Sequence, residues 1–255
     1  MLDRLFNIDQ KVAIITGGST GLGLQIAETF ARAGSIVILC SRKKEQCEEK
    51  AKWLCEKGYK AFGYGCDVTQ LVQIESLLTN VIDQHGNVDI LVNNSGATWG
   101  ESVEKMPLDA WNKVMNVNVT GTFLMSQQVG KEMIRNGGGK IINVSSIAGM
   151  RAEPPEVLNA IGYSTSKAAI LHFTKDLARK WAAHNIHVNA IAPGFFPSKM
   201  TRGVLEEKEA LITANNPMKR LGDDETLIGV MLFLASAASD YITGQVIAVD
   251  GGSSL

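Results

Sequence analysis

The residues best suited to carry out chemistry are Tyr163 and Lys167, which stand four positions apart in a stretch with helical periodicity. Residues with this spacing share one face of a helix, so a phenol and an ammonium would be neighbours. A tyrosine with its usual pKa of about 10 is a slow acid at neutral pH, and a nearby cation lowers that pKa by favouring the phenolate. The pair predicts a tuned proton donor, although the same spacing also fits an ordinary helix surface.

A serine at the end of a buried strand is the second group of interest. Ser146 lies at the carboxyl end of the predicted strand 140–144, and open α/β sheets bind their ligands at the carboxyl ends of the strands. A hydroxyl there can donate to a substrate carbonyl and stabilise the charge that develops on its oxygen. Ser145 is the alternative, because neighbouring residues of a strand point to opposite faces of the sheet.

A glycine-rich segment separates the first predicted strand from the first predicted helix. Glycines allow a tight turn there and let a pyrophosphate approach free N–H groups at the positive end of the helix. No Gly-Lys-Ser/Thr sequence follows, which excludes a P-loop, and a turn with nothing bound is the alternative. The predicted phosphate-binding residues are Gly17, Gly18, Ser19, Thr20, Gly21, Leu22 and Gly23.

The residues after the second predicted strand bear on the choice of dinucleotide. A fold that selects NAD places an acidic residue about 20 positions after the glycine turn, where it accepts hydrogen bonds from the ribose. Ser41, Arg42 and Lys43 stand there instead, and a guanidinium can hold a 2′-phosphate through charge-assisted hydrogen bonds. We therefore expect NADP rather than NAD as the cofactor, and we expect Ser41 and Arg42 to contact it. The alternative is a solvated basic start to a surface helix.

The elements that position these groups follow an alternating pattern. Short β-branched runs alternate with amphipathic stretches, which is typical of βαβ units around a parallel sheet. We predict one α/β domain over residues 1–255, a doubly wound Rossmann fold with a parallel sheet of about seven strands flanked by helices. The predicted strands are 11–15, 35–40, 60–66, 88–93, 140–144, 187–192 and 245–249. The predicted helices are 22–33, 43–57, 69–84 with Thr69 as its cap, 107–136, 163–183 and 225–235.

Composition and charge exclude several classes of protein. The 25 basic and 26 acidic residues leave a net charge of −1, so no overall field attracts nucleic acid. The four cysteines lack CxxC spacing and the four histidines are scattered, which predicts reduced thiols and no metal site. No secretory signal is evident, and the longest apolar stretch is about half of what a bilayer requires. We expect a cytoplasmic protein that binds neither nucleic acid nor membrane.

Taken in their order along the sequence, the motifs of this protein resemble those of the short-chain dehydrogenase/reductase family along nearly the whole chain. Two positions depart from the family pattern, since Ser95 replaces the usual Ala and Ser198 the usual Thr. The matching pieces are Thr16-Gly17-xxx-Gly21-x-Gly23, Asp67-Val68, Asn93-Asn94-Ser95-Gly96, Asn118, Ser146, Tyr163-xxx-Lys167 and Pro193-Gly194.

The resemblance implies roles for these residues. It implies that Ser146, rather than Ser145, polarises a substrate carbonyl, that Tyr163 delivers the proton, and that Lys167 tunes Tyr163 and binds the nicotinamide ribose. Asn118 would hold a water that leads to Lys167, with a helix-packing role as the alternative. The implied cofactor contacts are Asp67 and Val68 at the adenine, Asn94 and Gly96 at the ribose, Phe196 and Ser198 at the carboxamide, and also Tyr163, Lys167, Pro193 and Gly194.

The implied activity is NADP(H)-dependent hydride transfer between nicotinamide and a ketone or secondary alcohol. Residues 96–100 and 192–198 are similar to a branch of 3-oxoacyl reductases that includes the rhamnolipid-pathway ketoacyl reductase, which favours a thioester of acyl-carrier protein or coenzyme A. A loop and helix at about 194–215 would close over the substrate. A sugar-acid or polyol dehydrogenase, such as a gluconate 5-dehydrogenase, is the alternative, and a non-catalytic NADP-binding protein a more distant one. The family commonly forms tetramers, so a homotetramer is implied.

Overall fold

Seven parallel strands form one sheet in the computed structural model, which describes residues 2–199 and 201–255. The strand order is β3-β2-β1-β4-β5-β6-β7, so the predicted fold class is confirmed. The strands are β1 Val12–Thr16, β2 Ile36–Ser41, β3 Ala61–Gly65, β4 Ile90–Asn93, β5 Gly139–Val144, β6 Ile186–Pro193 and β7 Val246–Val249.

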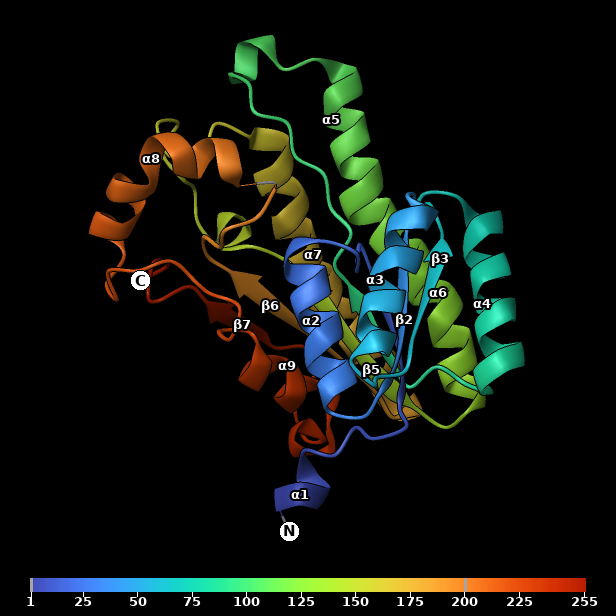
Figure 1. Ribbon diagram of the computed structural model, residues 1–255. Helices are drawn as coiled ribbons and strands as arrows, with labels where there is room; N and C mark the ends of the chain where they lie inside the picture. Colours follow the sequence, from blue (N-terminus) through green and yellow to red (C-terminus); the bar gives the residue numbers. More distant parts are fainter. Residues whose placement is uncertain (1, 200) are drawn as a thin grey trace.

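Helices cover both faces of this sheet (Figure 1). Because alternate residues of a strand point to opposite faces, β1 contributes to two apolar cores: Ala13 and Ile15 face one set of helices, and Val12 and Ile14 face the other. The first set is α2 Gly21–Arg32, α3 Lys44–Glu56 and α9 Ile228–Ala235. The second set is α4 Leu71–His85, α6 Gly121–Arg135 and α7 Ile161–Trp181. Outside these sets lie α1 Leu2–Leu5, α5 Leu108–Met115 and α8 Arg202–Asn215.

The stretch expected as a helix over 107–136 is interrupted. A π-helical turn at Asn116–Thr120 separates α5 from α6. Gly121 follows this turn and packs closely against Val68, since a Cβ at position 121 would lie 2.6 Å from Val68 Cγ2. Such turns insert an extra residue into a helix and occur frequently at functional sites. Here the turn contains Asn118.

The predicted capping of the third helix by Thr69 is wrong. The helix begins at Leu71, with Gln70 at its N-cap and no side-chain capping bond. The Thr69 hydroxyl instead donates to Asp67 Oδ1 over 2.8 Å, and the same oxygen accepts the Thr69 N–H. A carboxylate two residues away therefore competes successfully with the helix end for this side chain.

The direction in which successive strands are added to the sheet reverses between β1 and β4. From β1 the sheet extends to β2 and β3 on one side, and from β4 to β7 on the other. Loops that leave the carboxyl ends of two such strands diverge and form a crevice where α/β proteins bind ligands. The glycine turn follows β1 and Asn94 follows β4, so both lie at this crevice.

Residues 2–199 and 201–255 contain neither a membrane-spanning helix nor a cluster of metal-binding side chains. No helix in this part of the chain is long and apolar enough to cross a membrane. The same residues contain no group of three or more His, Cys, Asp or Glu side chains arranged to hold a metal ion.

Candidate active site

The glycine turn leaves the start of α2 open toward the crevice. Gly17 and Gly21 adopt φ angles of +64° and +53°, which favour glycine because they lie in the left-handed region. Thr20 is extended at the N-cap and makes no side-chain capping bond. A Cβ on Gly23 would collide with the Gly17 carbonyl, so this glycine permits close packing of the turn on the helix. The free N–H groups of the first helical turn therefore remain available to an anion.

Asn94 fastens the glycine turn to the end of β4. Its backbone N–H and that of Ser95 both donate to Thr16 Oγ1 over 2.9 Å. The Asn94 side-chain amide donates to the carbonyl oxygens of Thr16 and Gly17 over 2.9 and 3.2 Å. These bonds hold the two sides of the crevice in a fixed relation.

Two adjoining cavities run along the crevice, with volumes of about 250 and 220 Å³. The first has Ser41, Arg42, Asp67 and Val68 in its wall, together with Ser19. The second is lined by Gly21, Leu22, Asn94, Tyr163, Lys167, Pro193, Gly194, Phe196 and Ser198. Both cavities share Gly17, Thr20, Ser95, Gly96 and Lys199.

Of the predicted cofactor residues, only Gly18 and Gly23 line neither cavity. A Cβ on Gly18 would lie 2.8 Å from Leu39 Cδ2, so this residue packs against β2. The other predicted residues surround an elongated space with an open helix end at its middle. An elongated space with an open helix end is the kind of site that can hold a dinucleotide.

Phe196 lines the second cavity, but its ring packs against another part of the chain. Its ring is buried and packs so closely on Gly222 that a Cβ there would collide with it. The Phe196 carbonyl accepts the Thr201 hydroxyl over 2.6 Å, and Thr201 Oγ1 lies 2.9 Å from Ser198 Oγ. Sequence reasoning missed Thr201, which ties together the segment that begins at Pro193.

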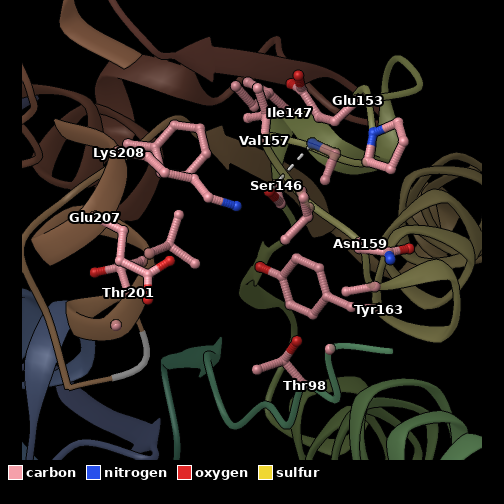
Figure 2. Close-up of a pocket in the computed structure, with 18 of the residues that line it drawn as sticks. Thr98, Ser146, Ile147, Glu153, Val157, Asn159, Tyr163, Thr201, Glu207 and Lys208 are labelled. Carbon is pink, nitrogen blue, oxygen red and sulfur yellow. Dashed lines mark hydrogen bonds between the residues drawn. The ribbon is translucent and has the colours of Figure 1, made fainter. Parts of the chain in front are cut away.

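A third cavity, of about 620 Å³, opens beside the second one. The two have Ser146, Tyr163, Gly194 and Thr201 in common. Figure 2 shows the side chains of Ser146 and Tyr163 directed into the same space. The larger cavity therefore begins where the proposed proton donor and carbonyl-polarising group meet.

The choice between the two serines follows from their hydrogen bonds. Ser145 is buried, and its hydroxyl donates to the Lys167 carbonyl over 2.8 Å, which holds α7 against β5. Ser146 precedes a short 3₁₀ turn, where its oxygen accepts the Ala148 N–H over 3.2 Å. That bond leaves the Ser146 proton free to be donated, so Ser146 is the serine placed to polarise a carbonyl.

The expected lowering of the Tyr163 pKa by Lys167 is wrong for this structure. Burial raises the pKa of the Tyr163 phenol above its ordinary value, and a hydrogen bond with Ser146 opposes this only in part. The Lys167 ammonium lies 5.6 Å from the centre of the tyrosine ring. Desolvation therefore sets the direction of the shift in the Tyr163 pKa, and the phenol holds its proton at neutral pH.

Lys167 carries a buried charge, and its ammonium makes a single hydrogen bond within residues 2–199 and 201–255. Its ammonium donates to the Val144 carbonyl over 2.8 Å, at the end of β5. Burial lowers the pKa of Lys167 to about 8. The ammonium has two further N–H groups, and it also lines the second cavity, so a hydroxyl-bearing ligand there would meet an unsatisfied donor.

Asn118 is held entirely by protein groups. Its Oδ1 accepts the Ala97 N–H over 2.7 Å, and its amide donates to the Ala97 carbonyl over 3.0 Å and to Ser166 Oγ over 2.8 Å. Ser166 in turn donates to the Tyr163 carbonyl over 2.7 Å. The side chain therefore joins the loop after β4 to α7, and the water expected between Asn118 and Lys167 stays a prediction. Sequence reasoning did not identify Ser166 as part of the site. The only sequence signal for it is that a small polar residue stands on the face of the helix that is buried.

Apolar side chains and one free cation line the larger cavity. Ile147, Val157 and Leu158 contribute to its apolar wall. Lys208 of α8 directs its ammonium into the cavity, as Figure 2 shows. The side chain of Glu153 is only 4% exposed and lies 3.1 Å from Arg151, so its charge is balanced.

The short-chain dehydrogenase family model matches residues 11–209 of the chain. The protein belongs to the short-chain dehydrogenase/reductase family. It is an oxidoreductase that acts on CH–OH or keto groups. This assignment agrees with the open helix end, the Tyr163–Lys167 pair and the serine found at the crevice.

Three similar proteins illustrate the range of the family around this enzyme. The 3-oxoacyl-(acyl-carrier-protein) reductase FabG of Aquifex aeolicus is 38% identical, over 95% of this chain and 96% of its own. The rhamnolipids biosynthesis 3-oxoacyl-(acyl-carrier-protein) reductase of Pseudomonas aeruginosa is 36% identical over 98% of both chains. The crystal structure of a gluconate 5-dehydrogenase from Burkholderia cenocepacia J2315 with NADP and tartrate is 33% identical, covers 99% of this chain and 98% of its own, and has a TM-score of 0.93.

Proposed function

We propose that this enzyme reduces 3-oxoacyl thioesters with NADPH. The observation that carries the proposal is the apolar wall of the 620 Å³ cavity, which begins at Ser146 and Tyr163 and can accept an acyl chain next to the reacting carbonyl. The 3-oxoacyl reductases among its relatives support the same substrate class.

NADP is the proposed cofactor because of the charges in the adenosine cavity. Arg42 and Lys43 line it, whereas Asp67 is the only carboxylate in its described wall and is already bonded to Thr69. The three residues after β2 are Arg42, Lys43 and Lys44, none of which can accept hydrogen bonds from a ribose 2′-hydroxyl through a carboxylate. A 2′-phosphate would meet two cations, and Arg42 can bind it through two parallel hydrogen bonds.

A bound nicotinamide supplies the hydride, and the chain supplies the proton. Ser146 donates a hydrogen bond to the ketone oxygen and stabilises the charge that builds up there. The raised pKa keeps the Tyr163 phenol protonated until that oxygen becomes basic enough to take its proton. The Lys167 ammonium, 5.6 Å from the centre of the Tyr163 ring, attracts the phenolate that remains, and it would bind the ribose hydroxyls of the nucleotide.

Acetoacetyl-CoA and acetoacetyl-acyl-carrier-protein test the substrate class. The purified enzyme is expected to oxidise NADPH with either thioester, as followed at the absorbance of the reduced nicotinamide, and to use NADH less well. A rate with both thioesters no higher than that of the Tyr163→Phe variant would contradict the proposal.

A sugar-acid dehydrogenase is the second candidate, and Lys208 is the observation that favours it. Its ammonium projects into the larger cavity without an ion pair to any described carboxylate, so it can bind a substrate carboxylate. The gluconate 5-dehydrogenase relative supports this class. Efficient turnover of 5-ketogluconate, with no turnover of the thioesters, would favour this function over the first.

The homotetramer stays a prediction. Leu108 of α5 is 71% exposed and Phe123 of α6 is 44% exposed, which provides apolar surface for an interface. Light scattering at micromolar protein concentration is expected to give four times the mass of the chain. A monomer would contradict this assembly.

A further inference from the structure

Lys199 has a position that neither the proposed catalysis nor substrate binding uses. It is the only charged residue that lines both cofactor cavities in the described part of the chain. The other residues common to both are Gly17, Thr20, Ser95 and Gly96. Lys199 therefore stands where the two cavities meet, above the glycine turn.

The neighbouring residues fix the main chain at this place. Ser198 N–H donates to Thr201 Oγ1 over 3.0 Å, and Thr201 N–H donates to Ser198 Oγ over 3.2 Å. A Cβ built on Gly21 would lie 3.6 Å from Ser198 Cβ, so the segment rests against the first residue of α2. Lys199 follows Ser198 directly, so its main chain lies close to the start of α2.

The charges around Lys199 favour an anion between it and the helix. No ion pair joins Lys199 to a carboxylate in residues 2–199 and 201–255. Of the two cavities, only the one that contains Arg42 has a described carboxylate in its wall, that of Asp67. The free N–H groups at the start of α2 lie beside the junction at which Lys199 lines both cavities.

We propose that Lys199 binds the diphosphate bridge of the dinucleotide from the side opposite the glycine turn. The turn and the start of α2 hold one side of the diphosphate through N–H groups, and the Lys199 ammonium neutralises the other. The 2′-phosphate belongs to Arg42 at the far end of the first cavity, so the two cations act on different phosphates. This assignment rests on dinucleotide binding by the family fold and not on the proposed thioester substrate.

Two fragments of the cofactor separate these roles in isothermal titration calorimetry. ADP carries a diphosphate and no 2′-phosphate, whereas adenosine 2′-monophosphate carries the 2′-phosphate alone. Lys199→Gln is expected to weaken ADP binding about tenfold and to leave adenosine 2′-monophosphate unchanged. Arg42→Gln is expected to do the reverse.

Two further variants serve as controls. Lys199→Arg keeps the charge and should restore most of the ADP affinity. Arg202→Gln removes a cation from the same segment that lines neither cavity, and it should bind both fragments like the unmodified enzyme.

The other outcomes overturn the assignment. Weaker binding of adenosine 2′-monophosphate by Lys199→Gln, with ADP unchanged, would place Lys199 at the 2′-phosphate. Unchanged binding of both fragments would make it a solvated surface residue. Because no ketone is present in these titrations, failure of the thioester assay does not affect their result.

Discussion

The side-chain amide of Asn118 donates to the Ser166 hydroxyl over 2.8 Å, and this bond joins the π-helical turn to α7. The Ser166 hydroxyl in turn donates a hydrogen bond to the Tyr163 carbonyl over 2.7 Å, so the backbone of the proposed proton donor is held from inside the protein. Asn118 also holds both polar groups of the Ala97 backbone. The loop after β4 and the helix of Tyr163 are therefore positioned by one amide.

Ser166→Ala is expected to lower the free energy of unfolding by about 1 to 3 kcal/mol, because it removes an acceptor from a buried amide. Urea denaturation followed by circular dichroism measures the change. Ser164→Ala, a substitution in the same helical turn, is the control. A loss no greater than that of the control would contradict the role of the bond.

Tyr163→Phe is expected to lower kcat by about 10² to 10⁴, because it removes the proton donor. NADPH binding, followed by the fluorescence of the bound nicotinamide, should change by less than a few-fold. A variant that keeps its turnover would exclude Tyr163 as the acid. A variant that loses cofactor binding would show that the loss of rate has another cause.

The two serines are expected to differ in what their removal affects. Ser146→Ala should lower kcat by about 10² to 10³ with little change in stability, since a donor to the developing oxyanion is lost. Ser145→Ala should mainly lower the free energy of unfolding, by about 1 kcal/mol, because its hydroxyl bonds to the Lys167 carbonyl. Turnover and urea denaturation of both variants decide the matter, and the reverse pattern would exchange their roles.

Lys167→Met is expected to stabilise the cofactor-free enzyme at pH 7 while abolishing turnover. Burial lowers the pKa of Lys167 from 10.5 to about 8, which corresponds to a cost of about 3 kcal/mol for the charged form. Between these two pH values the unfolded chain binds more protons than the folded one, so the stability contributed by this site rises with pH. The advantage of the variant should therefore shrink between about pH 8 and 10.5. Thermal denaturation at pH 7 and pH 10 would contradict this if the difference stayed constant.

Lys208→Met is expected to act on one substrate class only. It should raise KM for 5-ketogluconate about tenfold or more, because the carboxylate of this substrate loses its cationic partner. The KM for acetoacetyl-CoA should change by no more than a few-fold. Glu207→Gln, which removes the opposite charge from the same wall, should lower KM for the acid. Equal effects of Lys208→Met on both substrates would contradict this role.

The fold could be predicted because its signals are local. The run 11–15 is apolar at every residue but the first, as a strand buried on both faces requires, and β1 indeed spans Val12–Thr16 with every residue buried. The π-helical turn could not be predicted, since Asn116 to Thr120 resemble any helical segment. It becomes understandable only through the close approach of Gly121 to Val68.

The site could be predicted only as a set of residues. The placement of Tyr163 and Lys167 on one helix follows from their spacing, but the direction of the Tyr163 pKa depends on burial, which the spacing does not reveal. The same limit applies to Ser145 and Ser146, whose roles depend on which partner each hydroxyl meets. Phe196 shows it again, since its ring packs against Gly222, a residue far along the chain.

The wall shared by the second and third cavities has a kinetic consequence. The two cavities are directly connected, because both are lined by Ser146, Tyr163, Gly194 and Thr201. A ketone that binds before the nucleotide therefore has no surface to pack against on the side of the second cavity. A nicotinamide ring bound in the second cavity would supply such a surface. Turnover should then follow a compulsory order in which the nucleotide enters first and leaves last.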